Sequence, residues 1–283
     1  MTARAAIDLA APRRRRVRCR DVSSPPLPSV LVSPLLEARG VRHGFSTRNG
    51  GVSTGAFATL NAAAGPGDDP DAVRENLRLF SAAIDIDASR LYQIGQVHGS
   101  AVREVRPADD REALVREEGD ALVARDPSIA IGIRVADCVP ILLLDERSGH
   151  VAAVHAGWRG VVSSVISAAL VALAEHAVRP AIVAAIGPCI GVCCFEVGRD
   201  VADLIEESAP GEPSIVQARP GAAPHVDLRL AVRRQLLALG VEPARIDDVP
   251  GCTHCDDARF FSYRRDGARS GRHIAAIAPS ARG

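Results

Sequence analysis

The chain has 283 residues, of which 47% are hydrophobic and only 3% aromatic, so it can bury a sizeable core packed mostly by aliphatic side chains. Its formal net charge is zero, which gives no general attraction to nucleic acid or to an anionic membrane. All 34 basic residues are arginines, and the absence of lysine excludes Schiff-base catalysis, pyridoxal-phosphate attachment and the lysine of a Walker phosphate loop.

An arginine-rich run, RRRRVRCR at residues 13–20, lies in an N-terminal segment that is otherwise rich in Ala, Pro and Ser. Prolines interrupt the residues that follow it, so we expect no secretory or twin-arginine signal. We expect residues 1–30 to be a disordered tail and residues 31–283 to form a single domain. Tethering of RNA is the alternative role for the tail.

Seven cysteines, an odd number, occur in this chain without a predicted signal. We therefore expect reduced thiols and a cytoplasmic location rather than a disulfide framework. No run of 18 apolar residues is free of charges and chain-breaking residues, so no transmembrane helix is expected.

Helical and extended patterns follow one another along the chain. Residues 68–84 carry an Asp cap, an acidic first turn and apolar residues at helical spacing, which predicts a helix. Residues 90–105 alternate like a strand around Gln96-Val97-His98-Gly99. Short apolar runs then predict strands at 120–124, 129–137, 140–145 and 150–155.

From residue 160 the hydrophobic period changes from about two to about 3.6, which predicts one buried helix over 160–177. A buried strand is expected at 181–188 and a final strand at 273–278, with helices over 198–208 and 227–240. Because antiparallel hairpins are mixed with crossing helices, the order of elements favours an α+β fold or an α/β sandwich over a doubly wound parallel sheet.

Two apolar runs joined by the polar turn 146–149 read as a hairpin, with Cys138 at one end and His155 at the other. His98 likewise lies beside a glycine in a strand-like segment. Two imidazoles and a thiolate make a three-ligand set for Zn²⁺ that leaves a fourth position for water or substrate. Taken singly, each of these residues is also compatible with simple packing.

Six motifs occur in order between residues 41 and 276: GFSTRNGG, QVHG, ADCVPILL, HAGWRG, GPCIGVCCFEV and FFSYRRDG. Together they resemble the YfiH-like family, also known as multicopper polyphenol oxidase or laccase-domain proteins. The resemblance implies a layered α/β sandwich with mixed sheets, similar to a bacterial toxin deamidase, and a YfiH-like catalytic domain over residues 31–283. It also implies that His98, Cys138 and His155 are catalytic residues that bind zinc.

The resemblance implies purine nucleosides and phosphate as partners. The family's activities are phosphorolysis of adenosine, inosine, guanosine and methylthioadenosine, and deamination of adenosine. A metal with an open position can activate water for deamination, whereas phosphorolysis needs phosphate held against the ribose. A role in keeping wrong amino acids out of peptidoglycan precursors has also been proposed for the family.

Without lysine, arginine must hold the phosphate, and its planar guanidinium suits that anion. The candidates for substrate binding are Arg48, Arg159 and Arg264 (or Arg265), with backbone donors from the turn at Asn49 and with Tyr263 and Trp158 as stacking partners of the base. Surface ion pairs are the alternative role for the arginines, and core packing is the alternative for Trp158.

The remaining cysteines allow a second metal site. Cys252 and Cys255 form a CxxC motif, which can make a structural zinc site together with Cys193 and Cys194. The resemblance places Cys252 near the active site. No His-x-Glu triplet accompanies the motif, so the nucleobase-deaminase signature is absent. Since no His-x-His pair occurs among the eight histidines, copper is less expected than zinc.

Three functions remain open. The first is a zinc-dependent purine nucleoside phosphorylase with adenosine deaminase activity. The second is a cysteine hydrolase or amidase with Cys138 as nucleophile and His155 as base, acting in peptidoglycan precursor editing. The third is a non-enzymatic partner in cell-wall synthesis or division. We expect a monomer or weak homodimer that binds neither nucleic acid nor membranes.

Overall fold

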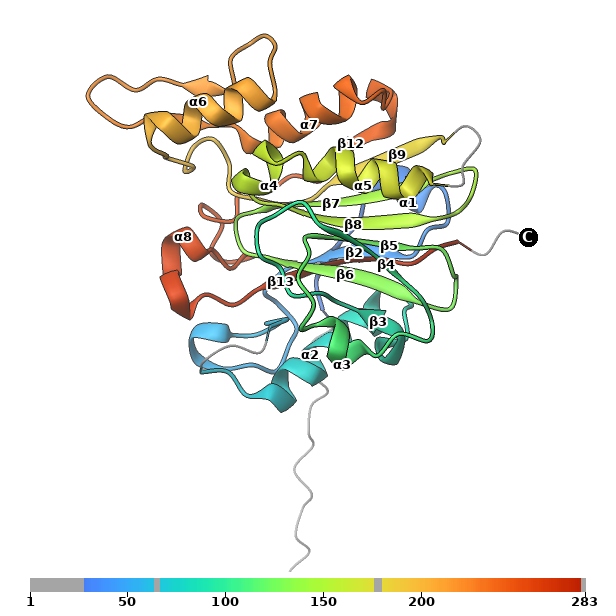
Figure 1. Cartoon of the computed structure of the whole chain (residues 1–283). Coiled ribbons are helices and arrows are strands. Elements are labelled where there is room, and N and C mark those ends of the chain that lie inside the picture. Colours follow the sequence, from blue (N-terminus) through green and yellow to red (C-terminus); the bar gives the residue numbers. More distant parts are fainter. Residues whose placement is uncertain (1–27, 64–66, 176–179, 281–283) are drawn as a thin grey trace, which may run out of the picture.

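The computed structural model describes residues 28–63, 67–175 and 180–280, and two mixed β-sheets lie at its centre between helices (Figure 1). The tail predicted for residues 1–30 lies almost entirely outside the described ranges. The five-stranded sheet has the order β1-β2-β13-β6-β3. Its strands are β1 Val30–Leu31, β2 His43–Ser46, β3 Leu91–Tyr92, β6 Ala130–Val135 and β13 His273–Ile277.

The six-stranded sheet has the order β12-β9-β7-β8-β5-β4. Its strands are β4 Val102–Val105, β5 Ala121–Ala124, β7 Val139–Asp145, β8 Val151–Ala156, β9 Ile182–Ile186 and β12 Ile246–Asp248. Each large sheet mixes parallel and antiparallel neighbours, because β3 runs parallel to β6, β4 to β5 and β12 to β9. A small antiparallel pair is formed by β10 Val216–Gln217 and β11 His225–Val226.

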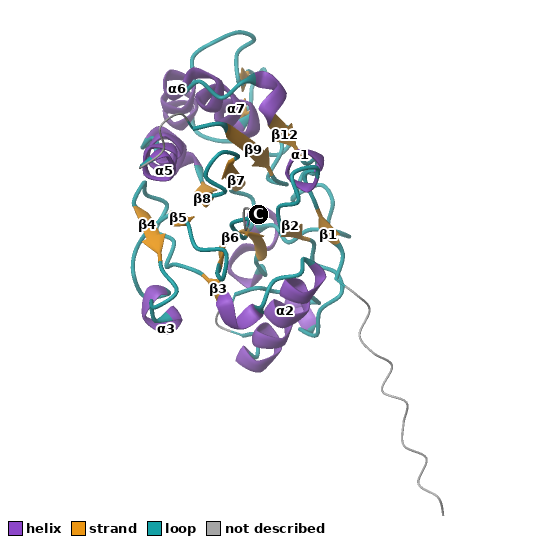
Figure 2. Cartoon of the chain, turned by 90° about the vertical axis from the view of Figure 1, so that its right-hand side faces the viewer, coloured by secondary structure: helices purple, strands orange, loops and turns teal. Residues whose placement is uncertain are grey.

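Helices cover the outer faces of the two sheets (Figure 2). The helices of the described residues are α1 Pro34–Glu37, α2 Pro70–Ala83, α3 Arg111–Leu114, α4 Trp158–Val162, α5 Val165–Ala174, α6 Arg199–Ser208, α7 Leu228–Ala238 and α8 Tyr263–Asp266. Side chains of α4 to α7 pack on the six-stranded sheet, and those of α2 pack on the five-stranded sheet. No helix in the described part of the chain combines the length and the apolar character that a bilayer crossing requires.

Strand β7 shows why the sequences of the central strands are continuous apolar runs. Ile141 and Leu143 pack against the helices, whereas Leu142 and Leu144 face the core between the two sheets. Successive side chains of a strand point to opposite faces, so a strand covered on both sides needs apolar residues at every position. Burial of each such leucine contributes about 1.5–3 kcal/mol. The predicted α+β class and layered sandwich with mixed sheets are confirmed.

Most of the predicted helices are confirmed. Helix α2 begins after Asp69, whose side chain accepts a hydrogen bond from the backbone N–H of Asp71, as an N-cap should. Asp227 caps α7 in the same way through the N–H of Leu230. Helix α6 corresponds to the helix predicted for residues 198–208.

Two predicted elements are wrong in detail. The single helix expected over 160–177 is two helices, because Ser164 adopts a left-handed conformation (φ 63°) that ends the α-helical path between α4 and α5. The strand expected over 90–105 is also two strands, β3 and β4, which belong to different sheets. The connection between them is a loop that carries His98, so alternation alone did not distinguish strand from loop here.

Candidate functional site

The hairpin of β7 and β8 brings Cys138 next to His155. The two strands are antiparallel, with Pro140 paired to His155 and Val139 paired to Ala156. Cys138 directly precedes β7, so it lies beside the end of β8. The carboxylate of Asp145 accepts hydrogen bonds from the backbone of Arg147 and Ser148, and this bonding fixes the turn that joins the strands. The hairpin predicted from the sequence is confirmed.

His98 completes a cluster of three potential metal ligands. One ligand atom from each of His98, Cys138 and His155 lies within 4.8 Å of the other two. The two imidazole rings meet edge to face, with their centroids 4.8 Å apart. His155 is buried and Cys138 is half-buried, whereas His98 is exposed. A metal held by these three residues would therefore be accessible from the side of His98, as a catalytic rather than a structural site requires.

Asp120, directly before β5, holds two of these residues in place. Its buried carboxylate accepts a hydrogen bond from Nδ1 of His155 at 2.7 Å. The same carboxylate accepts hydrogen bonds from the backbone N–H groups of His98 at 2.9 Å and Gly99 at 2.6 Å. Because Nδ1 of His155 is engaged, Nε2 is left to act as a metal ligand, which is a common arrangement in zinc sites.

The backbone at the site adopts conformations that L-residues rarely use. His98 has φ 63° and Asp137 has φ 88°. Such conformations cost about 1–3 kcal/mol each and persist where the surrounding structure demands them. Gly157 is needed for a different reason: a Cβ there would lie 2.9 Å from Cδ2 of His98 and 3.1 Å from Sγ of Cys138. The site is thus built by close backbone approach.

Cys138 and His155 have pKa values shifted in opposite directions. Burial opposes ionisation of the thiol, but the charge of His155 and hydrogen bonds from His155 and His98 lower the pKa of Cys138 to about 6. Burial likewise opposes protonation of the imidazole, but the Cys138 thiolate and Asp120 raise the pKa of His155 to about 9. Without a metal, the pair is therefore a thiolate and an imidazolium near neutral pH.

These three residues line a cavity of about 600 Å³. Four arginines line it as well, and Asp137 is the one carboxylate among its lining residues. Other polar and aromatic side chains complete the wall. The polar and aromatic lining residues include Gln96, Arg134, Arg159, Phe195, Tyr263, Arg264 and Arg272. A cavity with this excess of positive charge and an exposed tyrosine ring suits an anion together with a flat ring.

Three of the predicted substrate-binding residues line this cavity: Arg159, Tyr263 and Arg264. The side chain of Asp137 positions α8, because it accepts the backbone N–H of Arg264 at 2.7 Å and the hydroxyl of Thr253 at 2.6 Å. Tyr263, at the start of α8, is 53% exposed. The roles of these residues in binding stay predictions.

Arg48 and Asn49, which were also predicted to bind substrate, do not line the cavity. The guanidinium of Arg48 donates to the carbonyls of Ala58 and Asp257, and the side-chain amide of Asn49 donates to the carbonyl of Ala258. Their side chains brace the loop that leads to α8. Arg265, the alternative to Arg264, likewise donates to backbone carbonyls.

Trp158 is half-buried and packs against the core on the helix side of the six-stranded sheet. The guanidinium of Arg159 lies 4.4 Å from the centre of its ring. Trp158 is not among the residues that line the cavity, so its indole braces Arg159 and does not form part of the wall.

The sequence analysis did not identify three residues of the site: Asp120, Arg134 and Arg272. A charged residue inside the apolar run of β6 was the available signal for Arg134, which is largely buried and whose pKa is lowered by that burial. Asp120 is the last of several acidic residues before an apolar strand, and Arg272 directly precedes β13. Such positions also occur at ordinary strand ends, so neither gave a usable signal.

Comparison with known proteins places the chain among enzymes. A family model described as "Multi-copper polyphenol oxidoreductase laccase" matches residues 42–280. A protein of Mycobacterium tuberculosis named purine nucleoside phosphorylase is 38% identical over 238 residues, covering 84% of this chain and 91% of that protein. A protein from an unknown prokaryotic organism, named adenosine deaminase RL5, is 36% identical over 241 residues, covering 82% of this chain and 92% of the relative. The crystal structure of YlmD from Geobacillus stearothermophilus matches with a TM-score of 0.80 at 33% identity, covering 88% of this chain and 94% of that one.

Proposed function

This chain belongs to the family described as multi-copper polyphenol oxidoreductase laccase, and from that premise we propose that it acts on purine nucleosides. In the presence of phosphate it converts adenosine, inosine, guanosine and methylthioadenosine to the free base and the sugar 1-phosphate. In the presence of water it converts adenosine to inosine and ammonia. The names of the relatives support both reactions.

The observation that carries the proposal is a single cavity that contains both the His98, Cys138 and His155 cluster and four arginines. The cluster suits activation of water, and the arginines suit a bound phosphate. In a chain without lysine, arginine is the one side chain with a permanent positive charge for that anion.

We assign Zn²⁺ to the cluster. Two imidazoles and a thiolate are an ordinary zinc donor set, and the hydrogen bond from His155 to Asp120 orients one ligand as zinc sites require. Zinc bound there supplies a Lewis acid that polarises substrate or water. Copper, which the family description names, is less favoured because no His-x-His pair occurs in the sequence.

The other cavity residues have distinct roles in this proposal. Arg159 and Arg264 bind phosphate, with Arg134 and Arg272 adding positive charge to the same wall. Tyr263 is exposed enough to pack against the purine ring. Asp137 does not contact the phosphate, because its carboxylate is engaged by Thr253 and by the backbone of Arg264.

A cysteine hydrolase or amidase is the second candidate, and the lowered pKa of Cys138 favours it. In this reaction the Cys138 thiolate attacks the carbonyl carbon of an amide, for example in a peptidoglycan precursor. The C–N bond breaks, the amine leaves with a proton from His155, and water then hydrolyses the thioester. This reaction needs no metal ligand at residue 98. Activity that survives both chelation and His98→Ala, but is lost in Cys138→Ser, would therefore identify the hydrolase.

Metal analysis followed by product analysis tests the main proposal. The purified protein is incubated with adenosine, with and without phosphate. We expect adenine and ribose 1-phosphate when phosphate is present, and inosine when it is absent. Zinc-loaded protein that forms none of these products would refute the proposed function.

Three further properties belong to the proposal. Residues 31–283 act as one catalytic domain, since residues from 63 to 272 line one cavity. The protein is cytoplasmic and is a monomer or weak homodimer, which rests on the sequence alone. Its partners are nucleosides and phosphate rather than nucleic acid or membranes.

A further inference from the structure

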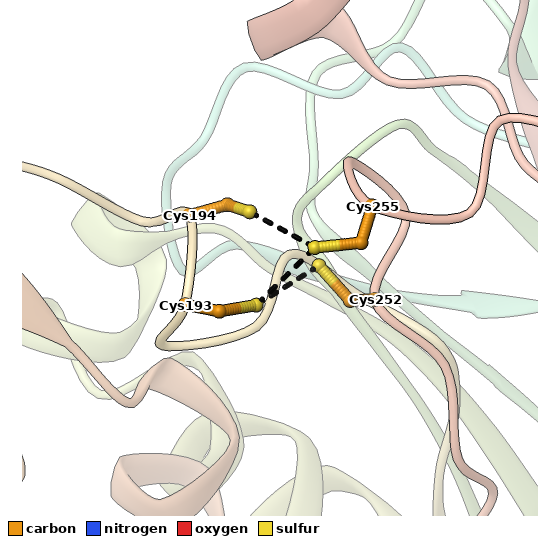
Figure 3. Close-up of side chains that lie close together, drawn as sticks. All are labelled: Cys193, Cys194, Cys252 and Cys255. Atoms are coloured by element: carbon orange, nitrogen blue, oxygen red, sulfur yellow. Dashed lines mark hydrogen bonds between the residues drawn. The ribbon is translucent and has the colours of Figure 1, made fainter.

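A group of four cysteines lies apart from the cluster of His98, Cys138 and His155 in the cavity. The sulfur atoms of Cys193, Cys194, Cys252 and Cys255 all lie within 4.8 Å of one another (Figure 3). Sγ of Cys193 is 3.6 Å from that of Cys252 and 3.5 Å from that of Cys255. Sγ of Cys194 is 3.2 Å from that of Cys255. We call these four residues the tetracysteine cluster.

Two loops far apart in the sequence form this cluster. Cys193 and Cys194 follow β9 in a tight turn, in which the backbone N–H of Cys194 donates to the carbonyl of Gly191. Cys252 and Cys255 follow β12. The loops meet at an isolated bridge between Cys189 and Cys252, which continues the parallel pairing of β9 with β12. Both cysteine pairs therefore lie at the same end of the sheet, beyond the carboxyl ends of β9 and β12.

The spacing of the sulfurs fits a tetrahedral metal site. Four thiolates around Zn²⁺, with Zn–S bonds of about 2.3 Å, lie about 3.8 Å apart, close to the distances seen here. A disulfide needs a separation of about 2.0 Å. Cys193 and Cys255 each contact two other sulfurs, so the arrangement is one group of four rather than two pairs.

The surroundings of the cluster favour the thiolate form of Cys252. The backbone N–H of Gly191 donates to Sγ of Cys252 at 3.3 Å, and a hydrogen bond of this kind stabilises a sulfur anion. A Cβ at Gly191 would lie 3.1 Å from Sγ of Cys193 and 3.4 Å from Sγ of Cys252, so glycine allows the loops to close. Arg265 donates to the carbonyls of Thr253 and His254, which places a positive charge beside a site that would carry two negative charges.

We propose that Cys193, Cys194, Cys252 and Cys255 bind one Zn²⁺ as a structural site, distinct from the cluster in the cavity. Binding forms four Zn–S bonds and releases the thiol protons to solvent, with no change in oxidation state. All four positions around the metal are filled by sulfur, so the site has no place for a substrate.

The site also has a consequence for the cavity. The loop of Cys193 and Cys194 carries Ile190 and Phe195, which line the cavity. The loop of Cys252 and Cys255 carries Thr253, whose hydroxyl donates to Asp137. A metal that joins the two loops therefore holds one wall of the cavity, although it does not contact the substrate. This inference does not depend on the proposed function.

Metal content of the full-length protein tests the proposal. We expect two zinc ions per chain in the wild type and one in Cys193→Ser/Cys255→Ser, which removes two exposed ligands. Cys138→Ser should lose the other ion. Cys189→Ala removes a cysteine outside both clusters and should keep both ions. Circular dichroism checks that each variant is folded.

Cobalt substitution identifies the ligands. Co²⁺ bound by four thiolates gives an intense sulfur-to-metal absorption band, which should persist in Cys138→Ser and vanish in Cys193→Ser/Cys255→Ser. The proposal is overturned if the wild type binds a single zinc that only Cys138→Ser removes, if iron occupies the four cysteines, or if mass spectrometry finds disulfides among them in freshly purified protein. Since these readouts are metal content and spectra, absence of nucleoside activity would refute the proposed function and leave this result intact.

Discussion

The carboxylate of Asp120 accepts a hydrogen bond from Nδ1 of His155 at 2.7 Å, and it also accepts one from the backbone N–H of His98. One buried acid thus orients an imidazole on β8 and fixes the position of the loop after β3. Burial opposes its ionisation, but these hydrogen bonds keep the pKa of Asp120 below its usual value, so it remains a carboxylate. The relationship makes Asp120 a positioning residue for two proposed metal ligands.

Asp120→Asn should weaken zinc binding at the cavity by about 10- to 100-fold, because the amide holds His155 and the His98 loop less firmly. Competition titration with a chromophoric chelator measures the change. Glu112→Gln is the matched control, since Glu112 is an exposed acid on α3. Equal zinc affinity in Asp120→Asn and the wild type would show that this contact does not orient a metal ligand.

Alkylation of the metal-free protein should report the pKa of Cys138. The thiolate is the reactive form, so the iodoacetamide rate at Cys138 should rise as pH increases through about 6 rather than through about 9. His155→Ala removes the positive charge beside the thiolate and should move this rise to higher pH. Peptide mass spectrometry follows the modified residue.

Cys189 is an internal control for that measurement, because burial raises its pKa to about 11 and it should stay unmodified. A midpoint at Cys138 that does not move when His155 is replaced would contradict the ion pair.

Arg159→Met should raise the KM for phosphate by about 10- to 100-fold, since a hydrogen bond to a charged group contributes about 1.5–3 kcal/mol. Arg159 is exposed and lines the cavity, so the replacement should leave the fold intact. Deamination measured without phosphate should change much less. Arg116→Met, at an exposed arginine outside the cavity, is the control, and a similar KM in both variants would exclude Arg159 from phosphate binding.

Gly157→Ala should lower zinc content and activity together, because the added Cβ would displace His98 or Cys138. Gly99→Ala is the matched control: its Cβ would meet neighbours only at ordinary contact distances of 3.6–3.8 Å. Metal analysis and thermal unfolding of both variants make the comparison. If Gly157→Ala keeps a full complement of zinc, the close packing around the site is not required for metal binding.

Local pattern accounts for much of what was predicted. The Asp69 cap and helical spacing identified α2, and two apolar runs around a polar turn identified the hairpin that brings Cys138 beside His155. These features depend on periodicity and on contacts between residues close in the chain, which a sequence displays directly. Where the left-handed Ser164 ends the helical path after α4, the periodicity continued and concealed the break.

The sequence by itself indicated an α+β fold or an α/β sandwich, the hairpin and the three candidate ligands, and its family resemblance added the layered arrangement. Only the tertiary structure decided which other residues reach the cavity: it brought Arg134 and Arg272 to the wall and left Arg48 against loop carbonyls. It also decided that four cysteines from two loops meet at one sheet edge. The physical reason is that the packing of one sheet on another and the paths of loops depend on contacts between distant residues, and no local period encodes those contacts.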